Sequence, residues 1–339
     1  MCTDFLIQSS DGAWVNGRSM EFGQELHTKL YVQAPKQKAV LRGLAGEEFE
    51  STPDYGYVGT SAMDLPVVTD GLNTAGLSTG ALWLPGTQYQ SLGPLPTKNV
   101  FSGFFVNWML SHCATTDDVR HALESGAVRV IGSEWVAKVG PLHFPVHDAR
   151  GNSIVIEFLE GKPVISENPV AVLTNQPTFP WHLENLRNYV NLSPMDSPWG
   201  KDNNGKVGNL PITQTGHGTG LSGLPGNATP PSRFVRTAFL KQFALQPKTA
   251  EEAAVLAFHL LNCVDIPKGT VGAKTLLGKD EYDYTQWVVV KDVTNRILNV
   301  RVYGSPLTWS VDLKNLDFTA LNGKQLPIPT GKVALPLPA

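Results

Sequence analysis

The first residue after the initiator methionine is Cys2, and this position gives it unusual chemistry. If Met1 is removed, Cys2 carries a free α-amino group beside its own thiol. An α-amine titrates near about pH 8 and a thiol near about pH 8.5, so the amine can act as base and the thiol as nucleophile near neutral pH. One residue would then supply two members of a catalytic triad. The competing interpretation is a cysteine of no special role.

The residues that follow predict a β-hairpin that returns charged groups to Cys2. Residues 3–8 alternate like a strand, Asp11-Gly12 is typical of a turn, and residues 13–16 begin a returning strand. A hairpin of this length places Arg18 and Glu21 near the Cys2 end. Arginine can stabilise a thiolate by charge, and a carboxylate can hold the amine. The competing interpretation is a solvated ion pair at the end of the hairpin.

Four groups of residues then follow one another in a recognisable order. They are Cys2-Thr3 with Asn16-Gly17-Arg18-Ser19-Met20-Glu21-Phe22; Asp70-Gly71-Leu72-Asn73 with Gly76-Leu77; Thr174-Asn175-Gln176-Pro177; and Gly223-Leu224-Pro225-Gly226 running into Pro231-Ser232-Arg233-Phe234. Together they span most of the chain. The pattern resembles the choloylglycine hydrolase family of N-terminal-nucleophile hydrolases, which contains bile salt hydrolases and penicillin V acylases. The resemblance implies an α+β fold, a four-layer αββα sandwich of two antiparallel sheets flanked by helices. The sequence contains no internal repeat and no convincing linker, so we expect residues 1–339 to form one domain.

The resemblance also implies roles for particular residues. Asn175 would donate its amide to the oxyanion of the tetrahedral intermediate, and the backbone N–H of Trp83 would be the second donor, where the family usually has Asn or Tyr. Arg233 would lie near the Cys2 thiol, with Arg18 on its other side. Glu21 would orient the α-amine, although the family usually has Asp there. No metal or cofactor is implied.

Composition excludes several other classes of protein. The chain has 339 residues, 42% hydrophobic and 17% charged, which is typical of a globular protein with a sizeable core. Its net charge is −3 and it has no basic run, which argues against nucleic acid and a polybasic membrane patch. No apolar run reaches the roughly 20 residues that span a bilayer. We expect a cytoplasmic protein as the sequence stands, or a periplasmic one if Met1 replaces a native signal peptide.

The hydrophobic pattern indicates strands at both ends of the chain and helices between them. Thr115 or Thr116 and Thr249 are typical helix N-caps. A long Gly-, Asn- and Pro-rich segment, from about 193 to 231, has the length of a functional loop. We expect strands over 29–32, 55–59, 77–82, 128–131, 153–158, 170–173, 286–291 and 297–303, and helices over 99–113, 117–123, 181–191, from Pro231, and 251–263.

Three other patterns were weighed as sites. Gly76-Leu77-Ser78-Thr79-Gly80 matches the GxSxG nucleophile elbow, but Pro85 prevents the helix that an elbow requires after its serine. His143 and His147 have the spacing of a helical metal pair, but Pro145 between them argues for strand or loop residues. The Gly-rich segment 216–223 lacks the lysine of a P-loop. Cys113 and Cys263 lie in apolar helical patterns and are interpreted as buried core thiols.

The predicted activity is hydrolysis of a linear N-acyl amide through a thioester on Cys2. Trp83 and Trp181 suggest an aromatic acyl pocket, which favours penicillin V or N-acyl-homoserine lactones over conjugated bile salts. A relative that binds such amides without turnover is the alternative from another class. The expected partner is a small-molecule substrate. Many family members are homotetramers, and the bridging segment would lie near 193–218.

Overall fold

The computed structural model describes residues 1–43, 46–132, 140–198, 205–274 and 278–331. Its frame is two large sheets, which we call the nucleophile sheet and the second sheet. In the nucleophile sheet the strand order is β15-β1-β2-β19-β20-β21, with β18 paired to β19. Every one of these pairs is antiparallel. The strands are β1 (Cys2–Gln8), β2 (Trp14–Phe22), β15 (Val172–Leu173), β18 (Val271–Lys274), β19 (Asp280–Asp292), β20 (Ile297–Val302) and β21 (Trp309–Asp312).

The second sheet has the order β14-β13-β12-β8-β7-β6-β3-β22, with β9 paired to β12. Its strands are β3 (Lys29–Gln33), β6 (Tyr57–Ala62), β7 (Leu65–Asn73), β8 (Ser78–Gly80), β9 (Leu82–Trp83), β12 (Leu142–His147), β13 (Ser153–Leu159), β14 (Lys162–Glu167) and β22 (Gln325–Pro327). Small ladders join β4 (Ala39–Arg42) to β5 (Glu48–Ser51), β10 (Lys98–Phe101) to β11 (Val128–Ile131), and β16 (Lys206–Val207) to β17 (Leu210–Pro211).

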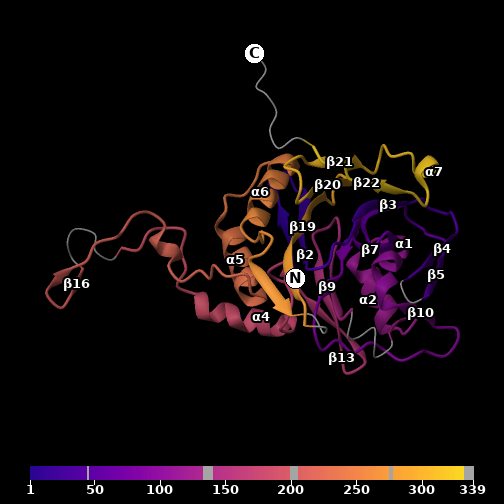
Figure 1. Cartoon of the computed structure of the whole chain (residues 1–339), viewed down its shortest axis with the longest axis horizontal. Helices are drawn as coiled ribbons and strands as arrows, with labels where there is room; N and C mark the ends of the chain where they lie inside the picture. The colour runs from indigo at the N-terminus through magenta and orange to yellow at the C-terminus, as the bar shows by residue number, and fades with distance from the viewer. Residues whose placement is uncertain (44–45, 133–139, 199–204, 275–277, 332–339) are drawn as a thin grey trace, which may run out of the picture.

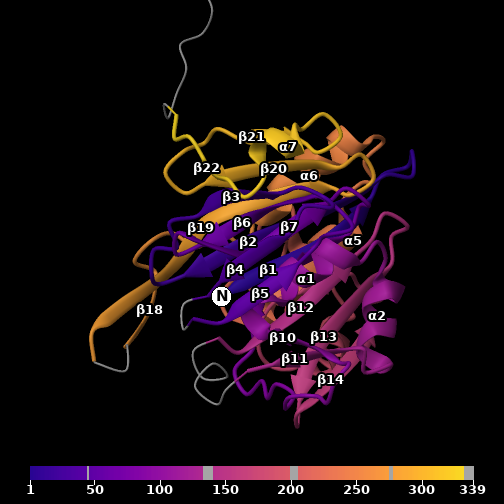
Figure 2. The ribbon, with the colours of Figure 1, turned by 90° about the vertical axis from the view of Figure 1, so that its right-hand side faces the viewer.

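Helices cover the outer faces of both sheets, as the predicted αββα sandwich requires. Figure 1 shows α5 (Pro230–Phe243) and α6 (Ala250–Asn262) beside β19 and β2, and α1 (Phe105–His112) and α2 (Thr116–Glu124) on the far side of β7. Figure 2 turns α1 and α2 toward the viewer. The remaining helices are η1 (Ser102–Phe104), α4 (Phe179–Asn185), η2 (Leu186–Tyr189), η4 (Thr219–Leu221) and α7 (Phe318–Leu321).

Two helix starts are set by the caps that the sequence predicts. The Thr115 side chain accepts from the Asp118 N–H, and the Asp118 side chain in turn accepts from the Thr115 N–H, which forms a capping box. The Thr249 side chain accepts from the Glu252 N–H at the start of α6. Both helices lie where the apolar pattern predicts them.

The helix predicted over 99–113 begins later than expected. Residues 98–101 form β10, which pairs in parallel with β11, and α1 begins only at Phe105. Val100 and Val130 are both buried in this ladder. A tertiary strand pairing therefore overrides the helical pattern there. The helix predicted over 181–191 also differs, because it starts at Phe179 with proline in its first turn and continues as the 3₁₀ helix η2.

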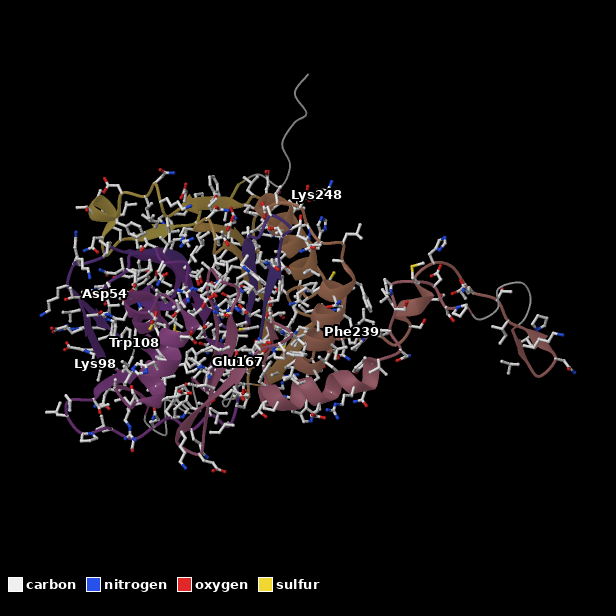
Figure 3. All side chains as sticks on the ribbon, turned by 180° about the vertical axis from the view of Figure 1, so that it is seen from behind. Asp54, Lys98, Trp108, Glu167, Phe239 and Lys248 are labelled. Carbon is white, nitrogen blue, oxygen red and sulfur yellow. The ribbon has the colours of Figure 1, made fainter. Side chains whose placement is uncertain are left out.

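The described part of the long predicted loop leaves the body as an arm, which we define as residues 190–198 and 205–229. Figure 1 shows it extending away from the layers, with β16 near its tip. Figure 3, drawn from behind, shows it leaving the body on the side of Phe239. In the part of the chain that is described, no helix is both long enough and apolar enough to cross a bilayer.

Candidate active site

Cys2 is the first residue of β1, and the predicted hairpin forms as expected. The register of β1 with β2 places Cys2 opposite Met20 and Asp4 opposite Arg18. Cys2 is 3% exposed, and its Sγ lies 3.8 Å from Met20 Sδ and 3.7 Å from Arg18 Nη2. The nucleophile predicted from the sequence is therefore a nearly buried thiol with a cation beside it.

Arg18 is buried completely, so it is not part of a solvated pair. Its Nη1 donates to Thr69 O at 2.6 Å, and its Nη2 donates to Ala81 O at 2.6 Å. Burial lowers the pKa of Arg18, but the charges of Cys2 and Asp70 outweigh that effect, so its pKa is raised. A positive charge is therefore held directly beside Sγ of Cys2.

Glu21 is also fully buried, near the end of β2. Its Oε1 accepts from Thr285 Oγ1 at 3.0 Å, while its Oε2 has no hydrogen-bond partner among the described residues. Burial raises the pKa of Glu21, and the charge of Arg233 offsets only part of that effect. A β-bulge in β19 lies between Thr285, opposite Glu21, and Trp287, opposite Met20. The orientation of the Cys2 amine by Glu21 stays a prediction.

Asn175 follows β15, whose register with β1 brings it next to Cys2. Its Oδ1 accepts from the backbone nitrogen of Cys2 at 2.7 Å and from Arg233 Nη2 at 2.8 Å. Two donors on Oδ1 define the orientation of the amide, so Nδ2 is a donor on the other side. One of its hydrogens goes to Trp83 O at 2.9 Å. The second hydrogen remains for an oxyanion.

Arg233 lies in the first turn of α5 and is fully buried. Its Nη1 donates to Thr3 Oγ1 at 2.7 Å and to the carbonyl of Cys2, and its Nε donates to Ala228 O at 2.9 Å. Burial lowers its pKa. Arg233 therefore lies near the Cys2 thiol, as expected, but its hydrogen bonds go to the Cys2 carbonyl and the Asn175 amide, whereas Arg18 faces Sγ.

The backbone of Trp83 faces the site. Leu84 N–H donates to Pro141 O, and Trp83 pairs with Leu142 between β9 and β12. Because backbone groups alternate along a strand, Trp83 directs its own N–H and C=O away from β12. Its carbonyl accepts from Asn175 on that side. The predicted second oxyanion donor therefore faces the same side as the first.

A pocket of about 250 Å³ opens beside Cys2. Its wall is mostly apolar and is drawn from both sheets and from η1. The ring centroids of Phe22 and Trp83 are 6.2 Å apart on this wall. Met1 lines the same space, its carbonyl accepting from Glu21 N–H at 2.8 Å. Other lining residues are Leu26, Met63, Leu65 and Phe104. A residue that precedes Cys2 therefore shares the space that a substrate would use.

Trp181 does not belong to this pocket, which corrects the expectation from the sequence. It lies in α4, is 44% exposed, and packs edge-on against His182. Its neighbour His182 is the residue that the sequence analysis missed. His182 Nε2 donates to Asn175 O at 2.9 Å, and His143 Nε2 donates to Thr174 O at 3.1 Å. Both imidazoles therefore hold the segment that carries the oxyanion amide.

The other patterns that were weighed have structural roles. Ser78 is in β8, and strand β9 rather than a helix follows it, so it forms no nucleophile elbow. Its Oγ donates to Asn16 Oδ1 at 2.9 Å. His143 and His147 lie in strand β12, as expected. Over the described ranges, no group of His, Cys, Asp and Glu side chains could hold a metal ion.

Cys113 is buried, as predicted, and burial raises its pKa. Cys263 is exposed, which corrects the second half of that prediction. It is the C-cap residue of α6, and its thiol donates to His259 O at 3.4 Å. The apolar pattern in the sequence includes Cys263, but helix α6 ends at Asn262, so Cys263 lies just beyond the helix with its side chain exposed.

Comparisons with known proteins identify the family of the chain. The model of the "linear amide C-N hydrolases, choloylglycine hydrolase family" matches residues 2–326. A bile salt hydrolase/transferase of Clostridium perfringens is 30% identical over 94% of each chain. Penicillin V acylase of Pectobacterium atrosepticum is 26% identical over 94% of this chain and 81% of its own.

Solved structures show the same fold. A variant of conjugated bile acid hydrolase from Clostridium perfringens superposes with a TM-score of 0.83, at 26% identity over 99% of both chains. Penicillin V acylase from Agrobacterium tumefaciens superposes with a TM-score of 0.75, at 23% identity over 97% of this chain and 92% of its own. With the predicted αββα layers and a cysteine at the first strand, these likenesses lead to one conclusion: the chain belongs to the choloylglycine hydrolase family and is a hydrolase of linear amide C–N bonds.

Proposed function

We propose that the chain hydrolyses N-acyl amides through a thioester on Cys2, and that conjugated bile salts are its substrate class. The observation that carries the proposal is the convergence on Cys2 of Arg18 at Sγ and Asn175 at the backbone nitrogen. Nucleophile, cation and amide donor lie within one hydrogen-bonded unit at the mouth of an apolar pocket.

The reaction needs Cys2 as the first residue, so Met1 and anything before it must be removed. Sγ attacks the acyl carbonyl and forms a C–S bond, while its proton passes through the Cys2 amine to the leaving nitrogen. The C–N bond breaks and the free amine leaves. Asn175 Nδ2 and the Trp83 N–H stabilise the oxyanion. Water then cleaves the thioester and restores the thiol, and Glu21 Oε2 holds the amine throughout.

The bile-salt assignment reverses the preference drawn from the sequence. Curated relatives at 30% identity are named bile salt hydrolases, whereas the penicillin V acylase is 26% identical. The pocket wall also contains aliphatic side chains such as Leu26, Met63 and Leu65, besides its aromatic rings. Such a wall suits the apolar body of a steroid acid.

Penicillin V is the second candidate, because the Phe22 and Trp83 rings are tilted at 52° on the pocket wall. This arrangement allows edge-to-face contact with a third aromatic ring, such as that of a phenoxyacetyl group.

The test is amine release from glycocholate, phenoxymethylpenicillin and a long-chain N-acyl-homoserine lactone, with protein whose intact mass shows Cys2 as the first residue. Cys2→Ala is the test variant. Cys113→Ala is the matched control, because Cys113 is buried in the layer of α1 and α2. We expect release from glycocholate that Cys2→Ala abolishes and Cys113→Ala retains.

Cys2-dependent release from penicillin V or the lactone alone would keep the mechanism and overturn the bile-salt assignment. Release that survives Cys2→Ala would overturn the mechanism. No release from any amide, together with an unreactive Cys2, would instead identify a relative that binds amides without turnover.

A further inference from the structure

Charged side chains are buried between the two sheets, behind Cys2. Asp70, Lys291 and Asp4 are each at most 1% exposed, and none of them lines the described pocket. They come from β7, β19 and β1, so both sheets contribute. The reaction described above uses none of them.

Asp70 connects this buried cluster to the nucleophile. Its Oδ2 lies 3.3 Å from Arg18 Nη1, and its Oδ1 accepts from Lys291 Nζ. Lys291 belongs to the nucleophile sheet and Asp70 to the second sheet, so the ion pair crosses the interface. The other end of the Arg18 guanidinium, Nη2, faces Cys2 Sγ. A continuous path of contacts therefore runs from Lys291 through Asp70 and Arg18 to the thiol.

The strand beside Asp70 leaves room for this pair. Gly80 in β8 is the register partner of Asp70 in β7. A Cβ on Gly80 would lie 2.6 Å from Asp70 Oδ2 and 2.9 Å from Arg18 Nη1. Glycine weakens a strand, and it often marks a position where another group must approach the backbone closely. Here the approaching groups are the carboxylate and the guanidinium.

Stability alone does not explain these charges. Burying an ion pair costs desolvation energy that its attraction often fails to recover, and well-packed apolar residues can replace it without loss. Burial raises the pKa of Asp70 and lowers that of Lys291, which shows that the site disfavours both charges. Perturbed groups next to a nucleophile are candidates for a functional role.

We propose that Asp70, anchored by Lys291, is a positioning residue that holds the Arg18 guanidinium against Sγ of Cys2. Without Asp70, the guanidinium keeps only neutral acceptors, the Thr69 carbonyl at Nη1 and the Ala81 carbonyl at Nη2, and loses the carboxylate that opposes its charge on the side away from the thiol. The inference rests on the proposed role of Cys2 as the nucleophile. It adds two residues that act on the thiol through Arg18.

Other titratable groups surround the thiol. Asp4 follows Cys2 by two residues on β1, and its Oδ1 is 2.6 Å from His147 Nε2 of β12. Its Oδ2 accepts from Asn16 Nδ2 at 3.0 Å. Arg233 donates to the Cys2 carbonyl, and Glu21 N–H donates to the carbonyl of Met1. Burial raises the pKa of Asp4, but the charges of His147 and Lys291 outweigh that effect and lower it, so the variants below also change the environment of Asp4. His147, Glu21 and Arg233 themselves are unchanged in every variant.

The experiment measures the pH dependence of Cys2 alkylation by iodoacetamide, in the full chain with Cys2 as its first residue. Peptide mapping separates Cys2 from Cys113 and Cys263. The key variant is Asp70→Asn/Lys291→Met, which removes one negative and one positive charge together and so leaves the net charge of the cluster unchanged. A rise in the thiol pKa therefore reports the position of Arg18 rather than lost charge.

We expect the double variant to raise the thiol pKa by about one unit, the lower end of the range for losing a nearby opposite charge. Amidase kcat should fall by about tenfold, with a smaller change in KM. The matched control is Leu123→Ala, which removes buried side-chain atoms in α2, far from the site. It should lower stability and leave the alkylation profile unchanged.

A double variant with the wild-type alkylation profile would overturn the inference. If that variant fails to fold, Lys291→Met alone decides: it removes the anchor and one positive charge, so an unchanged profile again overturns the proposal. If Cys2 of the wild-type protein is alkylated no faster than Cys263, the proposal that Cys2 is the nucleophile is overturned, and the inference falls with it. If Cys2 of the wild-type protein is reactive but the variants have the same alkylation profile, the role of Asp70 and Lys291 is overturned while Cys2 remains the proposed nucleophile.

Discussion

At the scale of single residues, the site depends on how Asn175 is held. Its Oδ1 is engaged by Arg233 and by the Cys2 nitrogen, and its backbone carbonyl is engaged by His182. In the proposed mechanism, these contacts orient Nδ2 for the oxyanion before any substrate binds. Donors oriented in advance are the usual source of large rate effects in acyl transfer.

We expect Asn175→Ala to lower kcat by about 10²–10³, the typical cost of losing one oxyanion donor. KM should change much less, because the acyl pocket is intact. Trp83→Phe is the control: its backbone N–H remains, so kcat should stay near wild type while the preference among acyl groups shifts. Steady-state kinetics with whichever amide the release assay shows to be hydrolysed provides the measurement. Equal losses in both variants would contradict the assigned roles.

His182 predicts a pH dependence of stability. Burial lowers its pKa from 6.5 to about 4, and its ring stacks on Phe234. Between these two values the unfolded chain binds a proton that the folded chain does not. Stability is therefore lost as the pH falls from 6.5 toward 4, by about 2 kcal/mol between pH 7 and pH 5.

The variant that tests this is His182→Gln, whose amide can still donate to Asn175 O without titrating. Urea unfolding at pH 7 and pH 5 should show a smaller loss on acidification for the variant than for wild type. An identical loss in both proteins would show that other groups cause the pH dependence.

At the scale of elements, hairpin β1–β2 and strand pair β7–β8 together make the nucleophile environment. Strand alternation puts Cys2 and Asp4 on one face of β1, and Arg18 and Met20 on the same face of β2. Facing them across the interface are Asp70 and Gly80 of the second sheet. The hairpin was predictable from its turn and its alternation of residues. Which residues of the second sheet pack against it was not predictable.

Gly80→Ala directly tests the packing of the second sheet against the hairpin. The added methyl would overlap Asp70 Oδ2 and Arg18 Nη1, and overpacking of a core typically costs about 1–3 kcal/mol. We expect this loss in the free energy of unfolding together with a fall in kcat. Gly226→Ala, where no atom lies within 4 Å of the new Cβ, should leave both unchanged. A fully active and stable Gly80→Ala protein would mean that the pair has more room than its distances indicate.

At the scale of the whole molecule, the arm is the feature that the layers do not explain. Val207 and Leu210 near its tip are 62% and 64% exposed, and Val190 at its base is 81% exposed. We propose that it contacts other copies of this chain, as the homotetramer suggested by the family resemblance would require. The single domain over 1–339 likewise stays a prediction.

Val207→Asp/Leu210→Asp places two charges in that contact, so we expect it to reduce the mass in solution to that of one 36.8 kDa chain, measured by light scattering. Val40→Asp, on a 51% exposed residue of β4 away from the arm, is the control and should keep the wild-type mass. A wild-type protein that is itself a single chain would contradict the proposal.

The order of motifs along the chain predicted the αββα class through the family resemblance, and the structure confirms it. The turn and alternation predicted the hairpin β1–β2, and the caps predicted the starts of α2 and α6, because these features can be read from neighbouring residues. The roles of Cys2 and of the residues around it stay predictions. Tertiary structure alone placed Trp181 outside the pocket, exposed Cys263, and converted residues 98–101 to a strand. Each of these outcomes depends on which side of an element meets another part of the chain far away in sequence, and no local pattern carries that information. The buried pair of Asp70 and Lys291 has the same origin, because its two residues are brought together only when the two sheets stack.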